Sequence, residues 1–234
     1  MIELNLLISL LRLTEKGPVS TEDVKRDVRI PGNIMEKMLH NLQNEELVSL
    51  KGPMVETDTS ARLKLAVKAV QLGADVENVY SLLHWREFEE ISAFALQKNG
   101  YLAFNDVHFK HESRKWQIDV VGCRKPLVVC IDCKHYHFGV SQSTIHKIAS
   151  TQMLRTKALR DALPNIKMKL ECTNWQRAKF VPAVLSLLPS AAKFYDNVPV
   201  VPVLQLQDFL CQLPMQIEAL TYFQRDYVHL GHDF

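Results

Sequence analysis

The sequence contains no run of about 18 uncharged apolar residues, which is the minimum for a helix that crosses a membrane. It opens with Met1-Ile-Glu-Leu-Asn, and this start lacks the basic segment that precedes the apolar stretch of a signal peptide. The chain also has no strong charge of one sign, since 28 Lys and Arg residues face 26 Asp and Glu residues. These absences predict a cytoplasmic protein that is not inserted in a membrane.

Cysteine is scarce and odd in number, with five residues in the chain: Cys123, Cys130, Cys133, Cys172 and Cys211. Most of them lie in apolar stretches, as is typical of reduced core thiols. The spacing Cys130-x-x-Cys133 resembles half of a zinc site, but no second pair follows at zinc-finger spacing. Residues three apart on a strand also face opposite sides, so the pair does not favour a zinc ribbon.

What is present is an ordinary soluble composition, with 47% apolar and 23% charged residues in 234. Such a length holds one large domain or two small ones, with enough apolar residues for a sizeable core.

The stretch from Gln117 to Lys134 predicts a β-hairpin, and it is the segment around which the other motifs are arranged. Ile118 to Val121 and Leu127 to Ile131 are rich in β-branched and aliphatic residues, and Gly122 to Pro126 has the composition of a turn. Because side chains alternate along a strand, Asp132 and Lys134 share a face with Val128 and Cys130.

Folding this hairpin about its turn brings Asp119 opposite or diagonal to Asp132, within ~5–8 Å if the two share a face. Two carboxylates and the ammonium of Lys134 then meet at the ends of apolar strands, where unpaired charges cost several kcal/mol each. Hard oxygen ligands of this kind favour Mg²⁺ or Mn²⁺. The alternative for Asp132 and Lys134 alone is an ordinary cross-strand ion pair.

A third acid comes from the predicted helix that runs from about Ser81 and stops at Asn99-Gly100. Helical spacing places Glu87 and Glu90 on a solvated face with Arg86, whereas Glu89 has an apolar flank. We therefore expect Glu89 to be the carboxylate that points inward.

This pattern resembles the PD-(D/E)xK nuclease superfamily, and it is most similar to archaeal Holliday-junction resolvases and Mrr-type restriction endonucleases. Four positions carry the resemblance: Glu89, Asp119, Asp132 and Lys134. Gly100-Tyr101 matches the Gly-aromatic pair that follows the helix glutamate in those proteins. The chain has Ile118 where the family usually has proline, and aspartate at 132 where glutamate is commoner.

The resemblance implies an α/β restriction-endonuclease-like domain, with a mixed sheet flanked by helices, over residues 76–234. It implies that Asp119, Asp132 and the carbonyl of Cys133 hold Mg²⁺ or Mn²⁺, and that Glu89 assists the metal. Lys134 would orient or deprotonate the attacking water. Gln152 occupies a place where RecB-like members often carry a helix glutamine, and a homodimer is expected.

Residues 1–75 are expected to form a winged helix-turn-helix with a linker helix. The predicted helices begin at Ile2, near Ser20 and at Ile34, and Leu47 to Glu56 has the pattern of a two-stranded wing. On the third helix, the residues expected to face inward are Ile34, Met38, Leu39 and Leu42. A further helix is predicted over Thr59–Gly73, with its apolar side formed by Leu63, Val67 and Val70.

The charge of residues 1–75 does not decide what this first domain binds. It has ten Lys and Arg against eleven Asp and Glu residues, and Glu36, Glu45 and Glu46 lie on or beside the expected recognition helix. Because a duplex reader normally presents a basic surface, DNA reading and dimerisation or protein docking remain equal alternatives.

The basic surplus of the chain lies in the second domain, above all in a predicted helix from about Ser143 to Ala162 and the segment after it. Four of its residues are expected to contact DNA phosphates: Lys147, Arg155, Lys157 and Arg160. The alternative is a solvated helix face. For His135 and His137, packing in the core or at an edge is favoured over phosphate contact, and Phe180–Leu188 and Val198–Leu206 are expected to be buried strands.

We therefore expect a Mg²⁺-dependent deoxyribonuclease that needs no organic cofactor, with branched or otherwise structured DNA in repair, recombination or restriction as candidate substrates. Two alternatives come from other classes. One is a catalytically inactive winged-helix DNA-binding or regulatory protein on a nuclease-like scaffold. The other is an RNA-cutting enzyme with a metal-free acid-base set.

Overall fold

The computed structural model describes residues 2–134, 141–163, 165–186, 190 and 192–226. Contacts divide the chain into two compact units, residues 1–87 and 88–234, which are described separately. This division lies inside the helix that starts at Trp85 and is later than the domain boundary we predicted near residue 75. Residues 76 to 87 belong with the first unit because Glu87 is tied to its interior.

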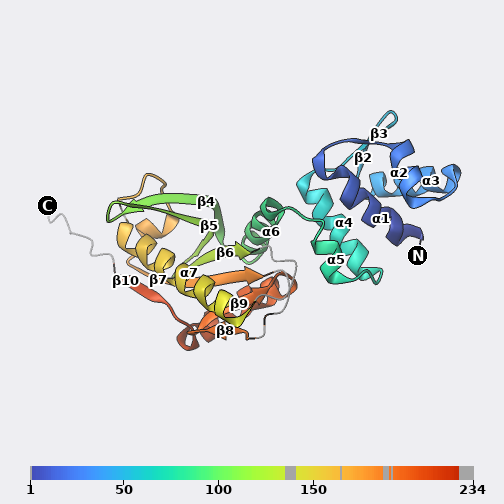
Figure 1. Ribbon diagram of the computed structural model, residues 1–234. Coiled ribbons are helices and arrows are strands. Elements are labelled where there is room, and N and C mark those ends of the chain that lie inside the picture. The colour runs from blue at the N-terminus through green and yellow to red at the C-terminus, as the bar shows by residue number, and fades with distance from the viewer. Residues whose placement is uncertain (1, 135–140, 164, 187–189, 191, 227–234) are drawn as a thin grey trace. The chain divides into compact units, whose positions relative to one another are not determined.

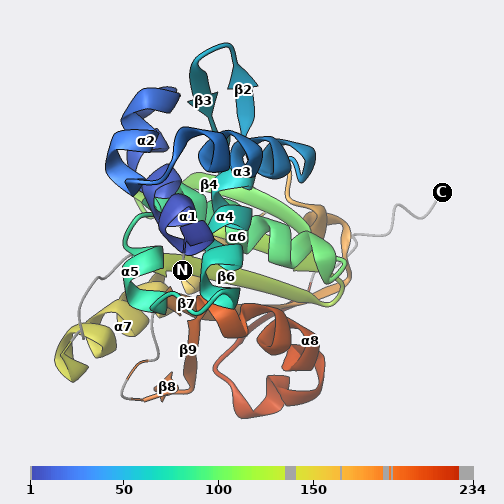
Figure 2. The ribbon, with the colours of Figure 1, turned by 90° about the vertical axis from the view of Figure 1, so that its right-hand side faces the viewer.

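Unit 1 consists of short helices and a small sheet (Figure 1). Its elements are α1 (Ile2–Leu13), η1 (Thr14–Lys16), β1 (Val19–Ser20), α2 (Thr21–Val28), α3 (Gly32–Asn44), β2 (Ser49–Lys51), β3 (Met54–Glu56), α4 (Thr59–Gln71) and α5 (Val76–Tyr80). The strands form an antiparallel sheet in the order β1-β3-β2. The hairpin β2–β3 projects beyond the helices, as Figure 2 shows. Three helices followed by a hairpin is the order that the sequence predicted.

Side chains at two helix starts explain where these helices begin. The hydroxyl of Ser20 accepts a hydrogen bond from the Asp23 N–H at 3.1 Å, which caps α2 at the predicted position. The carboxylate of Asp58 accepts one from the Ala61 N–H at 2.7 Å and caps α4 in the same way.

The inward faces of α3 and α4 differ from our predictions. On α3, Met35, Leu39 and Leu42 are buried at the spacing of one helical stripe, whereas Ile34 is 40% exposed. On α4, the buried stripe is formed by Ala61, Arg62, Leu65, Ala66 and Ala69, and not by the predicted Leu63, Val67 and Val70. A charged residue, Arg62, is part of the buried stripe of α4.

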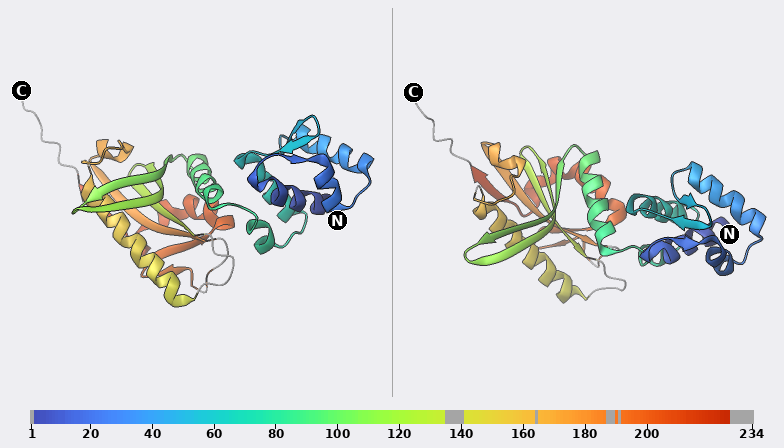
Figure 3. Two further views of the ribbon diagram at one scale, coloured as in Figure 1. Left: turned by 45° about the horizontal axis from the view of Figure 1, so that its top comes forward. Right: turned by 90° about the horizontal axis from the view of Figure 1, so that it is seen from above.

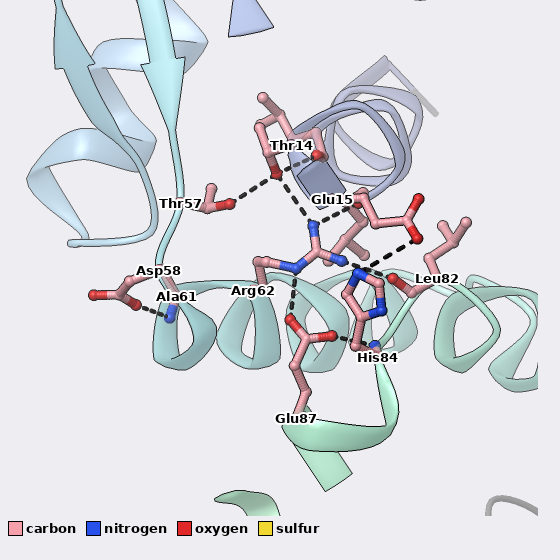
Figure 4. Close-up of polar contacts among 11 residues, drawn as sticks. Thr14, Glu15, Thr57, Asp58, Ala61, Arg62, Leu82, His84 and Glu87 are labelled. Carbon is pink, nitrogen blue, oxygen red and sulfur yellow. Dashed lines mark hydrogen bonds and ion pairs between the residues drawn. The ribbon is translucent and has the colours of Figure 1, made fainter. Parts of the chain in front are cut away.

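That arginine, Arg62, is the centre of a polar network inside unit 1 (Figure 4). Its Nε donates to Glu87 at 2.6 Å, and both side chains are 5% exposed. Its other nitrogens donate to the carbonyls of Leu11 and Leu82 and to the hydroxyl of Thr14. The network joins α1, α4 and the segment before α6. Our prediction that Glu87 lies on a solvated face is therefore wrong.

Unit 2 is built on a mixed sheet. Its elements are α6 (Trp85–Lys98), β4 (Leu102–His111), β5 (Arg114–Arg124), β6 (Leu127–Lys134), α7 (Gln142–Ala162), η2 (Glu171–Asn174), β7 (Arg177–Ser186), β8 (Phe194–Tyr195), β9 (Val198–Pro202), η3 (Val203–Gln205), α8 (Leu206–Gln216), η4 (Ile217–Ala219) and β10 (Phe223–Asp226). The described strands form a seven-stranded sheet in the order β4-β5-β6-β7-β9-β8, with β10 paired to β7.

Strand directions in this sheet are mixed, as expected. The neighbours β4, β5 and β6 are antiparallel, whereas β6, β7 and β9 are parallel. The predicted late strands correspond to β7 and β9. The last helix, α8, contains Pro214 and continues through it to Gln216. Among the described residues, no helix has both the length and the hydrophobicity that a membrane span requires.

Helices cover both faces of the sheet (Figure 3). On one face, α7 contributes Ala158, Leu159 and Ala162 to a core that also contains Val121 and Cys130 of the hairpin. On the other face, Leu96 of α6 packs directly over Gly122. The hairpin β5–β6 is therefore buried between α6 and α7, which is why its strands are almost continuously apolar.

Gly122 is a position where any larger residue collides with α6. A Cβ atom added there would lie 2.4 Å from Cδ2 of Leu96, which is itself fully buried. We expect Gly122→Ala to destabilise the fold by about 1–3 kcal/mol because the helix must shift. The free energy of unfolding by urea measures this. Gly32→Ala is the control, since its Cβ would meet nothing closer than 3.5 Å, and an equal loss in both variants would contradict the prediction.

Candidate functional site

The hairpin that holds the candidate site has the predicted register. Val120 pairs with Ile131 and Val121 pairs with Cys130, which brings Asp119 across from Asp132. The turn is shorter than expected, because β5 continues to Arg124 and β6 starts at Leu127. The two aspartates thus lie at the same end of neighbouring antiparallel strands.

Asp119 is held by the backbone of the adjacent strand. Its Oδ2 accepts a hydrogen bond from the Cys133 N–H at 2.8 Å. Burial raises the pKa of Asp119 above its usual value, and repulsion from the Asp132 carboxylate raises it further. The hydrogen bond from Cys133 acts in the opposite direction. The two neighbouring carboxylates therefore repel each other.

Asp132 is the most deeply buried acid of the site, with 1% of its surface exposed. One of its oxygens, Oδ1, accepts hydrogen bonds from two cationic groups, Lys134 Nζ at 2.9 Å and Arg155 Nη1 at 2.5 Å. Lys134 comes from the same strand two residues later, as predicted. Arg155 comes from α7, which covers this face of the sheet. Such pairing is what allows an ionised carboxylate to remain buried.

Glu89 lies at the same corner of the sheet but approaches from α6, on the other face. Burial raises the pKa of the Cys133 thiol, while a hydrogen bond with Ser92 opposes this rise. Repulsion from three carboxylates adds to it: Asp119, Asp132 and Glu89. Over the described part of the chain, no three His, Cys, Asp or Glu side chains are grouped closely enough to hold a metal ion. The assistance of Glu89 to a metal stays a prediction.

Gln152 is fully buried on α7 behind the hairpin. Its Nε2 donates to the carbonyl oxygen of Cys130 at 2.7 Å, and within the described residues its Oε1 has no hydrogen-bond partner. The amide therefore fixes the distance between α7 and β6, two residues before Asp132. Its expected place near the site is consistent with this contact.

The four basic residues expected to contact DNA differ in their surroundings. Lys147 and Lys157 on α7 are exposed. Arg160 pairs with Asp161 and lies over the ring of Phe223, so part of its charge is already used. Arg155 pairs with Asp132 and is only partly exposed, and this contact could not be revealed by sequence spacing. His135 and His137 lie outside the described residues.

One irregularity accompanies Asp119. On β4, Asp106 stands across from it with a φ of 54°, and the pairing of β4 with β5 skips this position. The Asp106 carboxylate accepts a hydrogen bond from Gln117 and pairs with His108. Asp106 was not among the predicted site residues, because nothing in its local sequence signals a positive φ.

The aspartate pair fits a divalent cation by the chemistry of its donors. Mg²⁺ prefers oxygen ligands and is usually held by one or two carboxylates together with waters and phosphate oxygens. Asp119 and Asp132 supply two carboxylates, and the carbonyl of Cys133, the residue after Asp132, is a third oxygen. Burial and, after it, repulsion from Asp132 raise the pKa of Asp119, and such a cation would relieve this repulsion.

The raised pKa of Asp119 implies that its ionised carboxylate destabilises the folded protein. When the folded pKa of a carboxyl exceeds its unfolded value, the folded state binds more protons, so stability falls as pH rises from the unfolded to the folded pKa. In EDTA at pH 7, we therefore expect Asp119→Asn to raise the midpoint of thermal unfolding, and this gain should vanish at acidic pH. A pH-independent change, or a loss at pH 7, would contradict this.

Three comparisons place the chain among known proteins. The family model of the nuclease-related domain, NERD, matches residues 84–201, which is half of the chain. An uncharacterized protein of Archaeoglobus fulgidus is 28% identical over 133 residues, covering 56% of this chain and 92% of that protein.

Two solved structures match the chain at low identity. A crystal structure of a protein of unknown function, AF1548, matches 42% of this chain and 46% of its own, with 16% identity and a TM-score of 0.30. The crystal structure of protein VC1899 from Vibrio cholerae matches 93% and 52%, with 13% identity and a TM-score of 0.40. The chain spans about half the length of each. The family match shows that the chain belongs to the nuclease-related domain family.

Proposed function

We propose that the protein is a metal-dependent endonuclease that hydrolyses phosphodiester bonds of DNA at Asp119, Asp132 and Lys134. One observation supports this most strongly: two carboxylates and a lysine meet at the ends of β5 and β6 inside a nuclease-related domain. The PD-(D/E)xK assignment, the Mg²⁺ or Mn²⁺ dependence and a homodimeric state are parts of the same proposal.

In this proposal Asp119 and Asp132 hold the metal ion, and Lys134 acts on the water or the phosphate. Asp119 is oriented by the Cys133 N–H, and Asp132 is oriented by Lys134, so both carboxylates present oxygens in fixed directions. A bound Mg²⁺ would neutralise charge on the phosphate oxygens and make a nearby water more acidic. Lys134 would donate to the attacking water or to the phosphate, since its ammonium already lies among the site's carboxylates.

DNA contact in this proposal comes from the exposed lysines of α7 and from unit 1. Lys147 and Lys157 would attract backbone phosphates in a salt-dependent way. Unit 1 would act as a winged helix that binds DNA, or as a dimerisation module, since both alternatives fit its nearly balanced charge. Equilibrium sedimentation at high concentration tests the dimer, and a monomer at every concentration would remove it.

The competing function is a DNA-binding or regulatory protein whose nuclease-like domain is inactive. One observation favours it: Asp132 is already neutralised by Lys134 and Arg155 without a metal. Titration calorimetry with Mn²⁺ separates the two. We expect wild-type protein to bind Mn²⁺ and Asp132→Ala to lose that binding, while Asp161→Ala, an exposed acid on α7, binds as wild type does. No difference between Asp132→Ala and wild type would overturn the proposed metal site.

A further inference from the structure

The contact between Arg155 and Asp132 has no role in the hydrolysis proposed above. From the fourth turn of α7, its Nη1 reaches Oδ1 of Asp132 at 2.5 Å, and 27% of its side chain is exposed. Lys134 binds the same oxygen at 2.9 Å. Asp132, by contrast, is almost completely enclosed. One carboxylate oxygen is thus shared by two cations, which is more positive charge than a single buried carboxylate needs.

On the face of the sheet that α7 covers, the charges of the described residues around Asp132 balance without any added ion. Asp119 and Asp132 contribute two negative charges, and Lys134 and Arg155 contribute two positive charges. A divalent cation placed beside the aspartates would meet the guanidinium of Arg155 at close range, where repulsion is strong in a partly buried site. Binding of the cation is therefore opposed as long as Arg155 stays on Asp132.

Arg155 also has the freedom and the chemistry to bind elsewhere. Its long side chain is partly exposed and lies on a helix that also carries the exposed lysines Lys147 and Lys157. A guanidinium matches a phosphate with two parallel hydrogen bonds, better than an ammonium does. A phosphodiester arriving at the aspartates would thus offer Arg155 a second anionic partner.

We propose that Arg155 is a displaceable counter-ion, which neutralises Asp132 in the free protein and moves to the substrate phosphodiester when a divalent cation binds. This inference rests on the proposed function. Its consequence is that cation and DNA bind together: each removes part of the cost of binding the other, and the free protein holds the cation weakly. Arg155 is then a positioning residue in the free protein and a substrate contact in the complex.

The test compares Mn²⁺ affinity by titration calorimetry in protein without DNA. We expect Arg155→Met, which keeps the length of the side chain and removes its charge, to bind Mn²⁺ about tenfold more tightly than wild type, because the repulsion is gone. Arg155→Lys keeps the charge and should remain near wild type. Lys167→Met removes an exposed charge that has no place in the proposed site and should change the affinity by less than about twofold.

The second measurement is DNA affinity in EDTA and in Ca²⁺, followed by fluorescence anisotropy of a labelled oligonucleotide. Wild type should bind DNA more tightly in Ca²⁺, and Arg155→Met should lose most of this gain. Thermal melts in EDTA identify any variant that fails to fold. If Arg155→Met does not fold, Arg155→Lys replaces it, and this variant should keep the gain in DNA affinity that wild type shows in Ca²⁺.

The outcomes separate the inference from the function beneath it. Equal Mn²⁺ affinity of wild type and Arg155→Met would overturn the role of Arg155 and leave the nuclease site standing. Weaker binding by Arg155→Met would also overturn it, since Arg155 would then support the ligands. Failure of both folded proteins to bind Mn²⁺ would overturn the proposed function itself, and the inference with it.

Discussion

Lys134→Ala is expected to lower the rate of Mg²⁺-dependent nicking of supercoiled DNA by about 10²- to 10³-fold, the usual loss when one donor to a developing negative charge is removed. Lys134 Nζ lies 2.9 Å from Asp132 Oδ1, so its ammonium is fixed beside the two carboxylates. The fold should survive the substitution, because Arg155 still pairs with Asp132. Circular dichroism melts of both proteins confirm this point.

The matched control for this prediction is Lys157→Ala. It removes the same type of side chain from the exposed surface of α7, at a position that does not contact Asp132 in the described structure. We expect a loss that is small and depends on salt, as for a phosphate contact. Equal rates in wild type and Lys134→Ala, in a preparation that cuts DNA, would exclude Lys134 from the reaction.

Arg62→Met is expected to destabilise unit 1 by about 3–5 kcal/mol, the usual cost of removing one partner of a buried ion pair. The Glu87 carboxylate would remain buried and unpaired, and the carbonyls of Leu11 and Leu82 would lose their donor. Figure 4 shows how these groups converge on the guanidinium. Urea unfolding of the full chain, followed by circular dichroism, measures the loss.

Two further variants control the Arg62 result. Arg26→Met breaks an exposed pair with Asp23 on α2 and should cost less than about 1 kcal/mol. The double variant Arg62→Met with Glu87→Gln removes the buried negative charge and should recover part of the stability. A loss for Arg62→Met no larger than that for Arg26→Met would show that the buried network contributes little.

Local patterns were sufficient to predict the hairpin of the candidate site. Strand periodicity and turn composition give the register that brings Asp119 across from Asp132, because both signals act over a few residues. The mixed sheet flanked by helices, predicted through the family resemblance and the apolar late segments, is confirmed.

Contacts between distant segments were not predictable in the same way. Glu87 is paired with Arg62, which lies 25 residues earlier, and Arg155 reaches Asp132, which lies 23 residues before it. Amphipathic spacing treats charged residues as solvated, so it placed Glu87 outside and chose Val67 and Val70 as the inner side of α4. Buried charge pairs reverse that rule, and a single sequence does not reveal which charges find partners.

The most direct measurement is cleavage of labelled duplex, single-stranded, flap and four-way-junction DNA, with an RNA strand included, in Mg²⁺, Mn²⁺ or EDTA. Wild type and Asp132→Asn are assayed side by side. The account predicts cutting of at least one DNA in Mg²⁺ or Mn²⁺, no cutting in EDTA and no cutting by Asp132→Asn. Cleavage that persists in EDTA, or that Asp132→Asn performs as well as wild type, would contradict a metal-dependent site at these aspartates.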